Sequence, residues 1–353
     1  METESTAITA PSTLLEELVE RTRLSPLQLT VVVELVLITF LVSTAYLDGV
    51  LAHPFNADFW RAGLIWPVII AYALLALPLS RGWRDGAIKA FRPLVSLDDD
   101  DFHLLLTEAS IFNRRREWLA LGISAGSTLL LSRPILSWAS MGRSGWLLAL
   151  YGLPAAGLMC GFIGLSIYSS MAGTKLFTEL SRYPLNVSVY DLASLEPIAR
   201  WSLRNAVAYI SGVTLSLLLL PRESFLEIEV IITIYTPLTL TAVVTFFLNM
   251  RSVHGDMVES KMRELEMVRG NLMRLSHALK ERTAQGKIED TRELLDSIKA
   301  WTAHEEWVRK LPEWPYTGAI KRNLALSLFL PVVVGIIREA LSGFLRRLLP
   351  LSR

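Results

Sequence analysis

The sequence has little cysteine, few charged residues and almost no net charge. The single cysteine, Cys160, lies in an apolar stretch, which excludes a disulfide within the chain and argues against a cysteine-based metal site. Charged residues make up 20% of the chain, against roughly 25% in soluble domains, and the net charge is +1. Because nucleic-acid binding calls for a strongly basic surface, we expect no nucleic-acid partner.

Motifs for catalysis and cofactor binding are also missing. The five histidines are scattered, and no pair has the spacing of a helix-borne metal site. The chain contains no phosphate-binding loop, dinucleotide fingerprint or Gly-x-Ser-x-Gly elbow. We therefore predict no cofactor and no bound metal, and the sequence favours neither an ATP-driven pump nor a kinase. We give little weight to an intramembrane enzyme, because the sequence shows no nucleophile paired with a base.

The sequence is rich in long apolar stretches. Hydrophobic residues make up 52% of the chain, and the mean hydropathy is +0.39. A bilayer core about 30 Å thick is crossed by about 20 apolar residues in a helix. Six stretches approach this length, at residues 27–47, 62–79, 118–136, 146–168, 203–220 and 225–250. The sequence predicts an all-α, polytopic membrane helix bundle with six core spans and a shorter seventh at 323–337.

The basic residues predict the orientation. Of the 35 Lys and Arg residues, 27 fall in segments that alternate with segments holding only four. Cytoplasmic loops carry an excess of Lys and Arg, so the segments with 27 basic residues are predicted to be cytoplasmic. We predict a multi-pass protein of the inner (plasma) membrane, surrounded by lipid. The N-terminal amphipathic segment 1–26 and the loops 81–117 and 171–202 are then cytoplasmic. The C-terminal segment 317–353 either crosses the membrane, which we favour, or re-enters it and leaves an amphipathic tail on the cytoplasmic side.

Four residues are candidates for lining a pore. Glu34 is the one ionisable residue well inside an apolar span, and a carboxylate there is costly unless it is neutral, paired or facing water. Glu34 either takes part in transport or forms an ordinary hydrogen bond between helices. Pro67, Pro154 and Pro237 recur in the second helix of three successive hairpins and predict bent helices. They mark either a threefold repeat around a cavity or the general abundance of proline in membrane helices.

Carboxylates gather at the predicted outer end of the sixth span. Glu223, Glu227 and Glu229 lie close together there, on the face where basic residues are fewest. They form either a cation-attracting outer mouth or simple solvation of the interface, the reading that we favour.

Small residues recur at helical spacing in the third and fourth spans. This pattern lets a second helix approach closely, and we favour a partner helix in the same chain over one in a second copy. The residues of this packing set are Gly122, Gly126, Ala156, Gly157, Cys160, Gly161 and Gly164.

The largest polar segment, residues 251–316, has a heptad-like pattern. Its first half carries apolar residues at intervals of four and three, which is typical of a coiled-coil seam: Val258, Met262, Leu265, Val268, Leu272, Leu275 and Leu279. A second amphipathic helix follows an interruption at residues 281–286. We predict an antiparallel cytoplasmic hairpin, which is too small to be stable alone and packs either on its own chain or between subunits.

The C-terminal half resembles a known group of proteins. The stretch Glu306-Trp307-Val308-Arg309-Lys310-Leu311-Pro312-Glu313-Trp314-Pro315-Tyr316 precedes a hydrophobic end and follows a helical hairpin, and Tyr183-Pro184-Leu185-Asn186 precedes Pro197. This arrangement is similar to that of a group of uncharacterised prokaryotic multi-pass membrane proteins. The resemblance implies a topology and no activity.

Two functions fit these features. The first is a homo-oligomeric ion channel or transport pore, in which the cytoplasmic hairpin assembles or regulates the subunits. The alternative is a non-conducting membrane scaffold or sensor that recruits a soluble cytoplasmic protein through residues 252–310.

Overall fold

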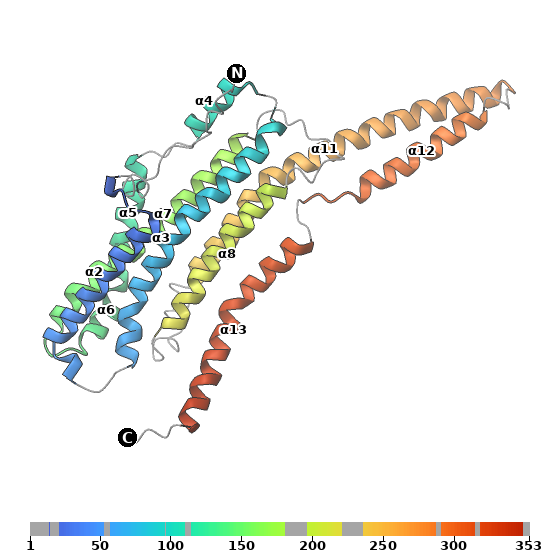
Figure 1. Cartoon of the computed structure of the whole chain (residues 1–353). Coiled ribbons are helices and arrows are strands. Elements are labelled where there is room, and N and C mark those ends of the chain that lie inside the picture. Colours follow the sequence, from blue (N-terminus) through green and yellow to red (C-terminus); the bar gives the residue numbers. More distant parts are fainter. Residues whose placement is uncertain are drawn as a thin grey trace.

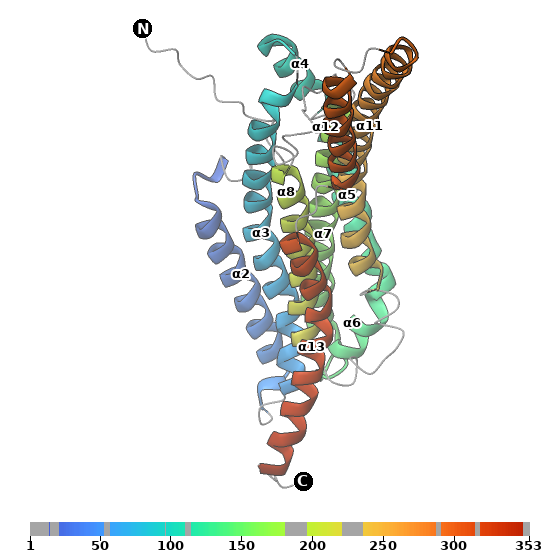
Figure 2. The same cartoon turned by 90° about the vertical axis from the view of Figure 1, so that its right-hand side faces the viewer.

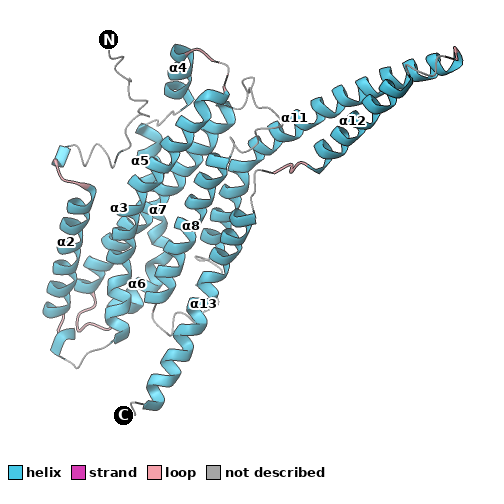
Figure 3. Cartoon of the chain, turned by 45° about the vertical axis from the view of Figure 1, so that its right-hand side comes forward, coloured by secondary structure: helices cyan, strands magenta, loops and turns pink. Residues whose placement is uncertain are grey.

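The computed structural model describes residue 14 and residues 21–52, 57–95, 97–109, 114–180, 196–220, 236–286, 291–314 and 318–348. These residues form helices and turns without a β-strand (Figure 3). Long helices lie side by side in a bundle, and one helix pair projects from one end of it (Figure 1). We call this end of the bundle the arm end and the opposite end the far end.

The bundle is built from apolar helices long enough to cross a membrane. Five described helices have this length and apolar character, and a bent helix pair forms a sixth candidate. Four of the five are α2 (Pro26–Leu47), α3 (Ala57–Phe91), α7 (Trp146–Leu180) and α8 (Glu196–Leu219). At 1.5 Å per residue, the 35 residues of α3 extend about 52 Å, so this helix continues beyond a bilayer core. The length and apolar character of these helices therefore indicate a multi-pass membrane protein.

The chain at residues 118–136 differs from the prediction of one continuous helix. It forms α5 (Arg114–Gly126), a 3-10 turn, η3 (Ser127–Leu131), and α6 (Ser132–Ala139). The segment Arg114–Leu130 and the helix Ser132–Ala139 are bent by 58° relative to each other. Pro134 provides the physical reason, because it has no N–H and its ring clashes with the carbonyl four residues earlier, at Leu130.

The longest helix connects the bundle to the projecting pair. Residues 221–235 lie outside the described residues, and they include the first part, 225–235, of the predicted sixth span. The helix α11 (Thr236–Ala284) follows them. Its 49 residues extend about 73 Å. The second helix of the pair, α12 (Thr291–Lys310), returns along α11. We call residues 261–284 together with α12 the arm.

Two hydrophobic clusters hold the bundle together. The arm-end cluster joins α3, α7, α8 and α11 with the short helix α4 (Asp99–Ala109), and its largest buried members are Phe91, Phe102, Phe177, Trp201 and Phe246. The far-end cluster joins α2, α3, α6 and α7 around the buried residues Leu41, Phe59, Trp66, Ile70, Trp138 and Tyr151. Because lipid is as apolar as these side chains, close van der Waals packing of the rings is the main favourable contribution where the helices lie in the membrane.

The last helix, α13 (Gly318–Leu348), runs along α8, and its C-terminal part continues beyond the far end of the bundle (Figure 2). Near its start, Ile320 is buried in the arm-end cluster. Near the far end, the Arg338 guanidinium donates hydrogen bonds to the carbonyl of Leu217, at 2.6 Å, and to that of Leu220. These carbonyls lie at the C-terminus of α8, where helix carbonyls lack partners within the helix. Arg338 therefore joins α13 to the C-terminus of α8 at the far end.

Candidate functional site

Glu34 lies on α2 against the far-end cluster. Its side chain is half-buried, and its Oε1 atom is buried without a hydrogen-bond partner among the described residues. It interacts electrostatically with Tyr151 of α7, which is fully buried. The Tyr151 hydroxyl donates instead to the carbonyl of Gly63, at 3.0 Å. An oxygen of Glu34 is therefore removed from solvent without compensation, which is costly for a carboxylate.

Aromatic rings pack around Tyr151 in the far-end cluster. The Trp66 and Trp138 rings meet edge to face with centroids 4.9 Å apart, and Phe59 stacks on Trp138 at 5.2 Å. Trp66 also contacts Tyr151, with centroids 5.7 Å apart. The Trp138 indole N–H donates to the carbonyl of Phe59 at 3.2 Å, which satisfies its polar group. The rings pack around Tyr151 and give this level of the bundle a packed apolar interior.

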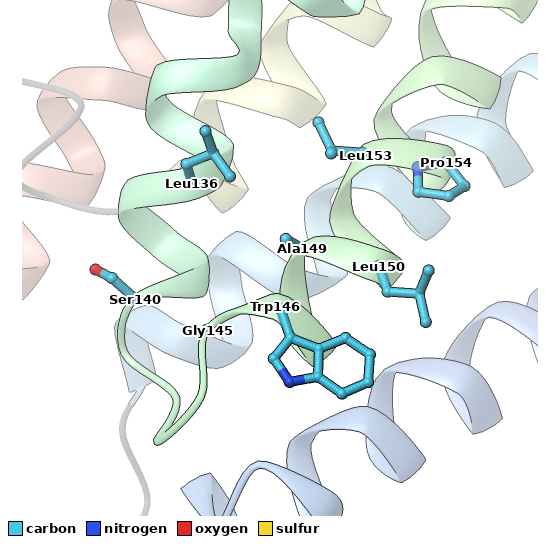
Figure 4. A pocket seen from close by; sticks show the side chains of 8 residues that line it. All are labelled: Leu136, Ser140, Gly145, Trp146, Ala149, Leu150, Leu153 and Pro154. Carbon is cyan, nitrogen blue, oxygen red and sulfur yellow. The ribbon is translucent and has the colours of Figure 1, made fainter.

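The three candidate prolines have different environments. Pro67 is buried within α3, next to Trp66. Pro154 is exposed on α7 and lines a groove of about 630 Å³ that is also lined by Leu136 and Trp146 (Figure 4). Pro237 is the second residue of α11, and its side chain lies outside the described part of the structure. Pro67 and Pro154 therefore face different surroundings rather than one shared cavity.

The acidic candidates Glu223, Glu227 and Glu229 lie outside the described residues.

The groove beside Pro154 has a mainly apolar lining. It lies between α6 and the start of α7 (Figure 4), and three of the side chains that line it, Leu136, Trp146 and Leu150, are exposed.

The glycines of α7 pack against α5. A Cβ added at Gly164 would lie 1.9 Å from the Ser124 Oγ atom and 3.0 Å from the Ala120 carbonyl oxygen. At Gly161 an added Cβ would lie 3.4 Å from the Leu121 Cγ atom. Neither distance at Gly164 leaves room for a side chain, so glycine there permits the close approach of the two helices.

The other small residues of the set divide between the interior and the surface. Ala156 is fully buried, while Gly157 and Cys160 are half-buried on α7. Added Cβ atoms at Gly122 and Gly126 of α5 would meet no atom of the described chain within 4 Å. The two small-residue stripes therefore have different surroundings: that of α7 lies between helices, and that of α5 is exposed.

A buried aspartate holds the far-end connections together. Asp48, which is 2% exposed, follows α2. Its carboxylate accepts hydrogen bonds from the backbone N–H groups of Ser144, at 2.6 Å, and Gly145, at 3.3 Å, just before α7. Negative charge at a helix N-terminus is favourable. A Cβ added at Gly142 would lie 2.0 Å from the Asp48 Oδ2 atom, so the turn closes tightly over this carboxylate.

A line of polar side chains between α3, α7 and α8 was not predicted from the sequence. Ser80 of α3 donates to the Asn205 side-chain oxygen of α8 at 2.6 Å. Farther along the bundle, the hydroxyl of Tyr209 donates to the carbonyl of Ser166, and that of Tyr72 donates to the carbonyl of Ala208 at 2.6 Å. On α8 the spacing of four residues between Asn205 and Tyr209 could have indicated a polar face.

Ion pairs and a small apolar contact join the two helices of the arm. Val308 of α12 is fully buried against Leu265 of α11. The His304 Nε2 atom lies 3.0 Å from the Glu264 Oε1 atom. Arg269 of α11 lies 3.3 Å from Glu305 of α12, which also pairs with Arg309 at 2.7 Å. Hydrogen bonds from Arg309 and Arg269 lower the pKa of Glu305, because they stabilise its charged form.

The base of the arm is closed by a segment that follows α12. The ring of His254 stacks on that of Trp314 with centroids 3.9 Å apart, and its Nδ1 atom lies 2.6 Å from the carbonyl oxygen of Glu313. The Lys261 ammonium donates to the carbonyl of Leu311 at 3.0 Å and to the Glu313 carboxylate at 3.1 Å. These contacts fix the direction in which α11 leaves the bundle.

Comparison of the chain with protein-family models, curated proteins and solved structures finds no match. In the part of the chain that the structure describes, no group of three or more His, Cys, Asp and Glu residues is arranged to hold a metal ion. The function is therefore argued from the geometry of the helices, the buried polar groups and the arm.

Proposed function

We propose that the protein is a membrane-anchored scaffold or sensor that recruits a soluble partner through its arm. The continuity of α11 carries this proposal, because a single helix of 49 residues runs from the bundle into the arm. A helix without a break transmits displacement and orientation along its axis. The position of the arm is thereby coupled to the packing of the membrane helices.

The surface of the arm supports partner binding. Large apolar side chains are exposed on both of its helices and lie among charged residues: Met262, Met267, Met273, Leu295 and Trp307. Methionine adapts its shape to different apolar surfaces, and exposed apolar side chains on a helix are a common means of recognition. We infer that the arm lies in the cytoplasm, because the segments at the arm end carry most of the basic residues.

Copurification with the full-length protein tests the scaffold function. Replacing Met267, Met273 and Trp307 together with serine should reduce recovery of the partner at least tenfold, because the apolar contact area is lost. The matched control replaces three exposed charged residues of the arm, Arg263, Glu281 and Lys299, with serine. Equal recovery with both triple variants would contradict recruitment through the apolar side chains.

A second function, a homo-oligomeric ion channel or transport pore, is favoured by one observation. Glu34 holds a carboxylate oxygen that has no partner in the described part of the chain, inside a helix long enough to cross a membrane, and such carboxylates commonly mark ion pathways. Several copies of the chain would then assemble around a pore.

Ion flux into liposomes tests this second function. Purified protein should conduct, and Glu34→Gln should change the flux at least tenfold because the charge is removed while the shape of the side chain is kept. The control is Glu281→Gln at the exposed tip of the arm, which should conduct as the parent protein does. The absence of flux from the parent protein would rule out the class, and unchanged flux in Glu34→Gln would remove this residue from the pathway.

A further inference from the structure

The groove between α6 and α7 is built from rows of residues spaced four apart, so each row lies along one face of a helix. A half-buried row on and just before α7 forms the floor: Gly145, Ala149 and Leu153. A more exposed row of α7 forms one wall (Figure 4): Trp146, Leu150 and Pro154. Leu136 and Ser140 of α6 form the opposite wall. The groove is therefore a channel that follows α7, with two walls and an apolar floor.

The length and position of this groove match one leaflet of a bilayer. From Trp146 to Pro154 it follows α7 for about 12 Å, at 1.5 Å per residue. The hydrocarbon of one leaflet is about 15 Å thick, half of the bilayer core. Trp146 is the first residue of α7, at the far end, and is 63% exposed, and tryptophan is typical of the membrane–water interface. The groove therefore begins at the level of the lipid headgroups and extends into the hydrocarbon.

Two exposed arginines border the groove. Arg143 lies in the turn between α6 and α7, next to the mouth of the groove, and Arg133 lies on the face of α6 that carries Leu136 and Ser140. Neither guanidinium forms an ion pair within the described part of the chain. The nearby carboxylate of Asp48 is buried and accepts hydrogen bonds from the backbone of the turn. The mouth therefore presents positive charge beside an apolar channel.

We propose that one acyl chain of an anionic phospholipid occupies this groove, with the phosphate of the lipid at Arg143. The apolar floor and walls receive the chain, and a guanidinium binds phosphate oxygens through two parallel N–H donors. The long side chain of Arg133 extends its charge toward the same headgroup level. An apolar protein segment would match the lining but would leave both arginines without an anionic partner. The bound lipid contacts α6 and α7 together and stabilises the bent span against its neighbour.

Native mass spectrometry of the full-length protein in a nonionic detergent tests this site. Protein freed of lipid is titrated with phosphatidylglycerol, which is anionic, or with phosphatidylcholine, which has the same acyl chains and no net charge. We expect one molecule of phosphatidylglycerol to stay bound at a concentration at least tenfold below the one that phosphatidylcholine requires. Equal retention of the two lipids would overturn the proposal.

Variants of the groove separate the contribution of the headgroup from that of the chain. Arg143→Gln removes the charge at the mouth, so phosphatidylglycerol should lose its advantage over phosphatidylcholine. Ala149→Phe fills the floor and should weaken the retention of both lipids at least tenfold. Ser140→Phe, at an exposed position of the opposite wall, makes the same test if Ala149→Phe does not fold. Unchanged lipid preference in Arg143→Gln, or unchanged retention in the groove-filling variants, would overturn the proposal.

Two matched controls change exposed residues outside the groove. Arg61→Gln removes another exposed arginine at the far end, and Val36→Phe adds an aromatic ring at a position of α2 that is 63% exposed. Both variants should retain phosphatidylglycerol as the parent protein does. A loss of preference in Arg61→Gln equal to that in Arg143→Gln would assign the selectivity to the general charge of the surface and overturn the proposal.

Photolabelling locates the chain in the parent protein without any substitution. Phosphatidylglycerol with a diazirine in one acyl chain should label α6 and the first turns of α7 in preference to α2 and α13, whose apolar side chains are also exposed. Excess unlabelled phosphatidylglycerol should suppress this labelling, and phosphatidylcholine should not. Equal labelling of all these helices, unaffected by excess phosphatidylglycerol, would show that only bulk lipid covers the groove and would overturn the proposal.

Discussion

Single residues at the far end determine how closely α2 and α7 can be connected. Asp48 is buried and accepts hydrogen bonds from the chain just before α7, and Gly142 closes over its carboxylate. No sequence motif identifies this arrangement, because Asp48 and Gly142 are far apart in the chain. Only the packing of the two helices brings them together.

A methyl group at position 142 should destabilise the protein. In Gly142→Ala the added Cβ would overlap the Asp48 carboxylate, so we expect a loss of about 1–3 kcal/mol in the free energy of unfolding. Thermal unfolding in detergent measures it. The control is Gly82→Ala, at a helical position where an added Cβ meets nothing within 4 Å; alanine there should be neutral or stabilise by about 0.5–1 kcal/mol. Equal destabilisation by both variants would show that the Asp48 contact is not the cause.

Other features at the residue scale were open to prediction in part. Glu34 was found from the sequence because a charge within an apolar stretch is conspicuous, and the structure adds that one of its oxygens is buried with no partner among the residues it describes. Serine and tyrosine in α3, α7 and α8 were missed because each changes the average hydropathy only slightly, and Asn205 was missed because it carries no charge. Their significance depends on which helices face each other, and one sequence does not specify this.

At the scale of elements, hydropathy located the apolar helices better than it described their shape. The stretch at residues 118–136 is apolar throughout most of its length, yet it is broken into α5, η3 and α6. An average over a window does not register the hydrogen bond that Pro134 cannot make. The heptad-like pattern of α11 predicted some buried positions and not others. Leu265 and Val268 are buried, whereas Met262 is 49% exposed.

The paired helices of the arm should loosen in acid. Hydrogen bonds from Arg309 and Arg269 lower the pKa of Glu305 in the folded protein, so its contribution to stability is present above the pKa of the unfolded chain, about 4.3. This contribution is lost as the pH falls from there through the lowered value. Spin labels at Thr283 and Arg292 report the separation of the two helices at the tip. Their distance distribution should broaden below about pH 4.

Glu305→Gln separates this effect from general acid unfolding. The variant should show a broader distribution at neutral pH and a smaller change on acidification, because glutamine carries no charge to lose. An identical pH response in the parent and the variant would mean that Glu305 does not hold the arm together.

At the scale of the whole molecule, α13 decides where the C-terminus lies. The sequence left two alternatives open, because a crossing helix places Arg338 and three later arginines on the side with few basic residues. In the structure α13 runs along α8 from the arm-end cluster to the C-terminus of α8. Arg338 uses its donors on the carbonyls that end α8, which gives a physical reason for an arginine at this position.

This arrangement predicts that the arm and the C-terminus lie on opposite sides of the membrane. Cysteines introduced at Thr283, in the arm, and at Ser352, near the C-terminus, should react differently with an impermeant thiol reagent in a background in which Cys160 is replaced by alanine. In right-side-out vesicles only the Ser352 position should react, and in inside-out vesicles only the Thr283 position. Reaction of both positions in the same vesicles would favour a C-terminal segment that re-enters, and α13 would then pack along α8 without crossing. Arg338→Met extends the test. Loss of the charged hydrogen bonds should lower the free energy of unfolding by about 1.5–3 kcal/mol. The labelling pattern should stay the same if apolar packing alone places α13.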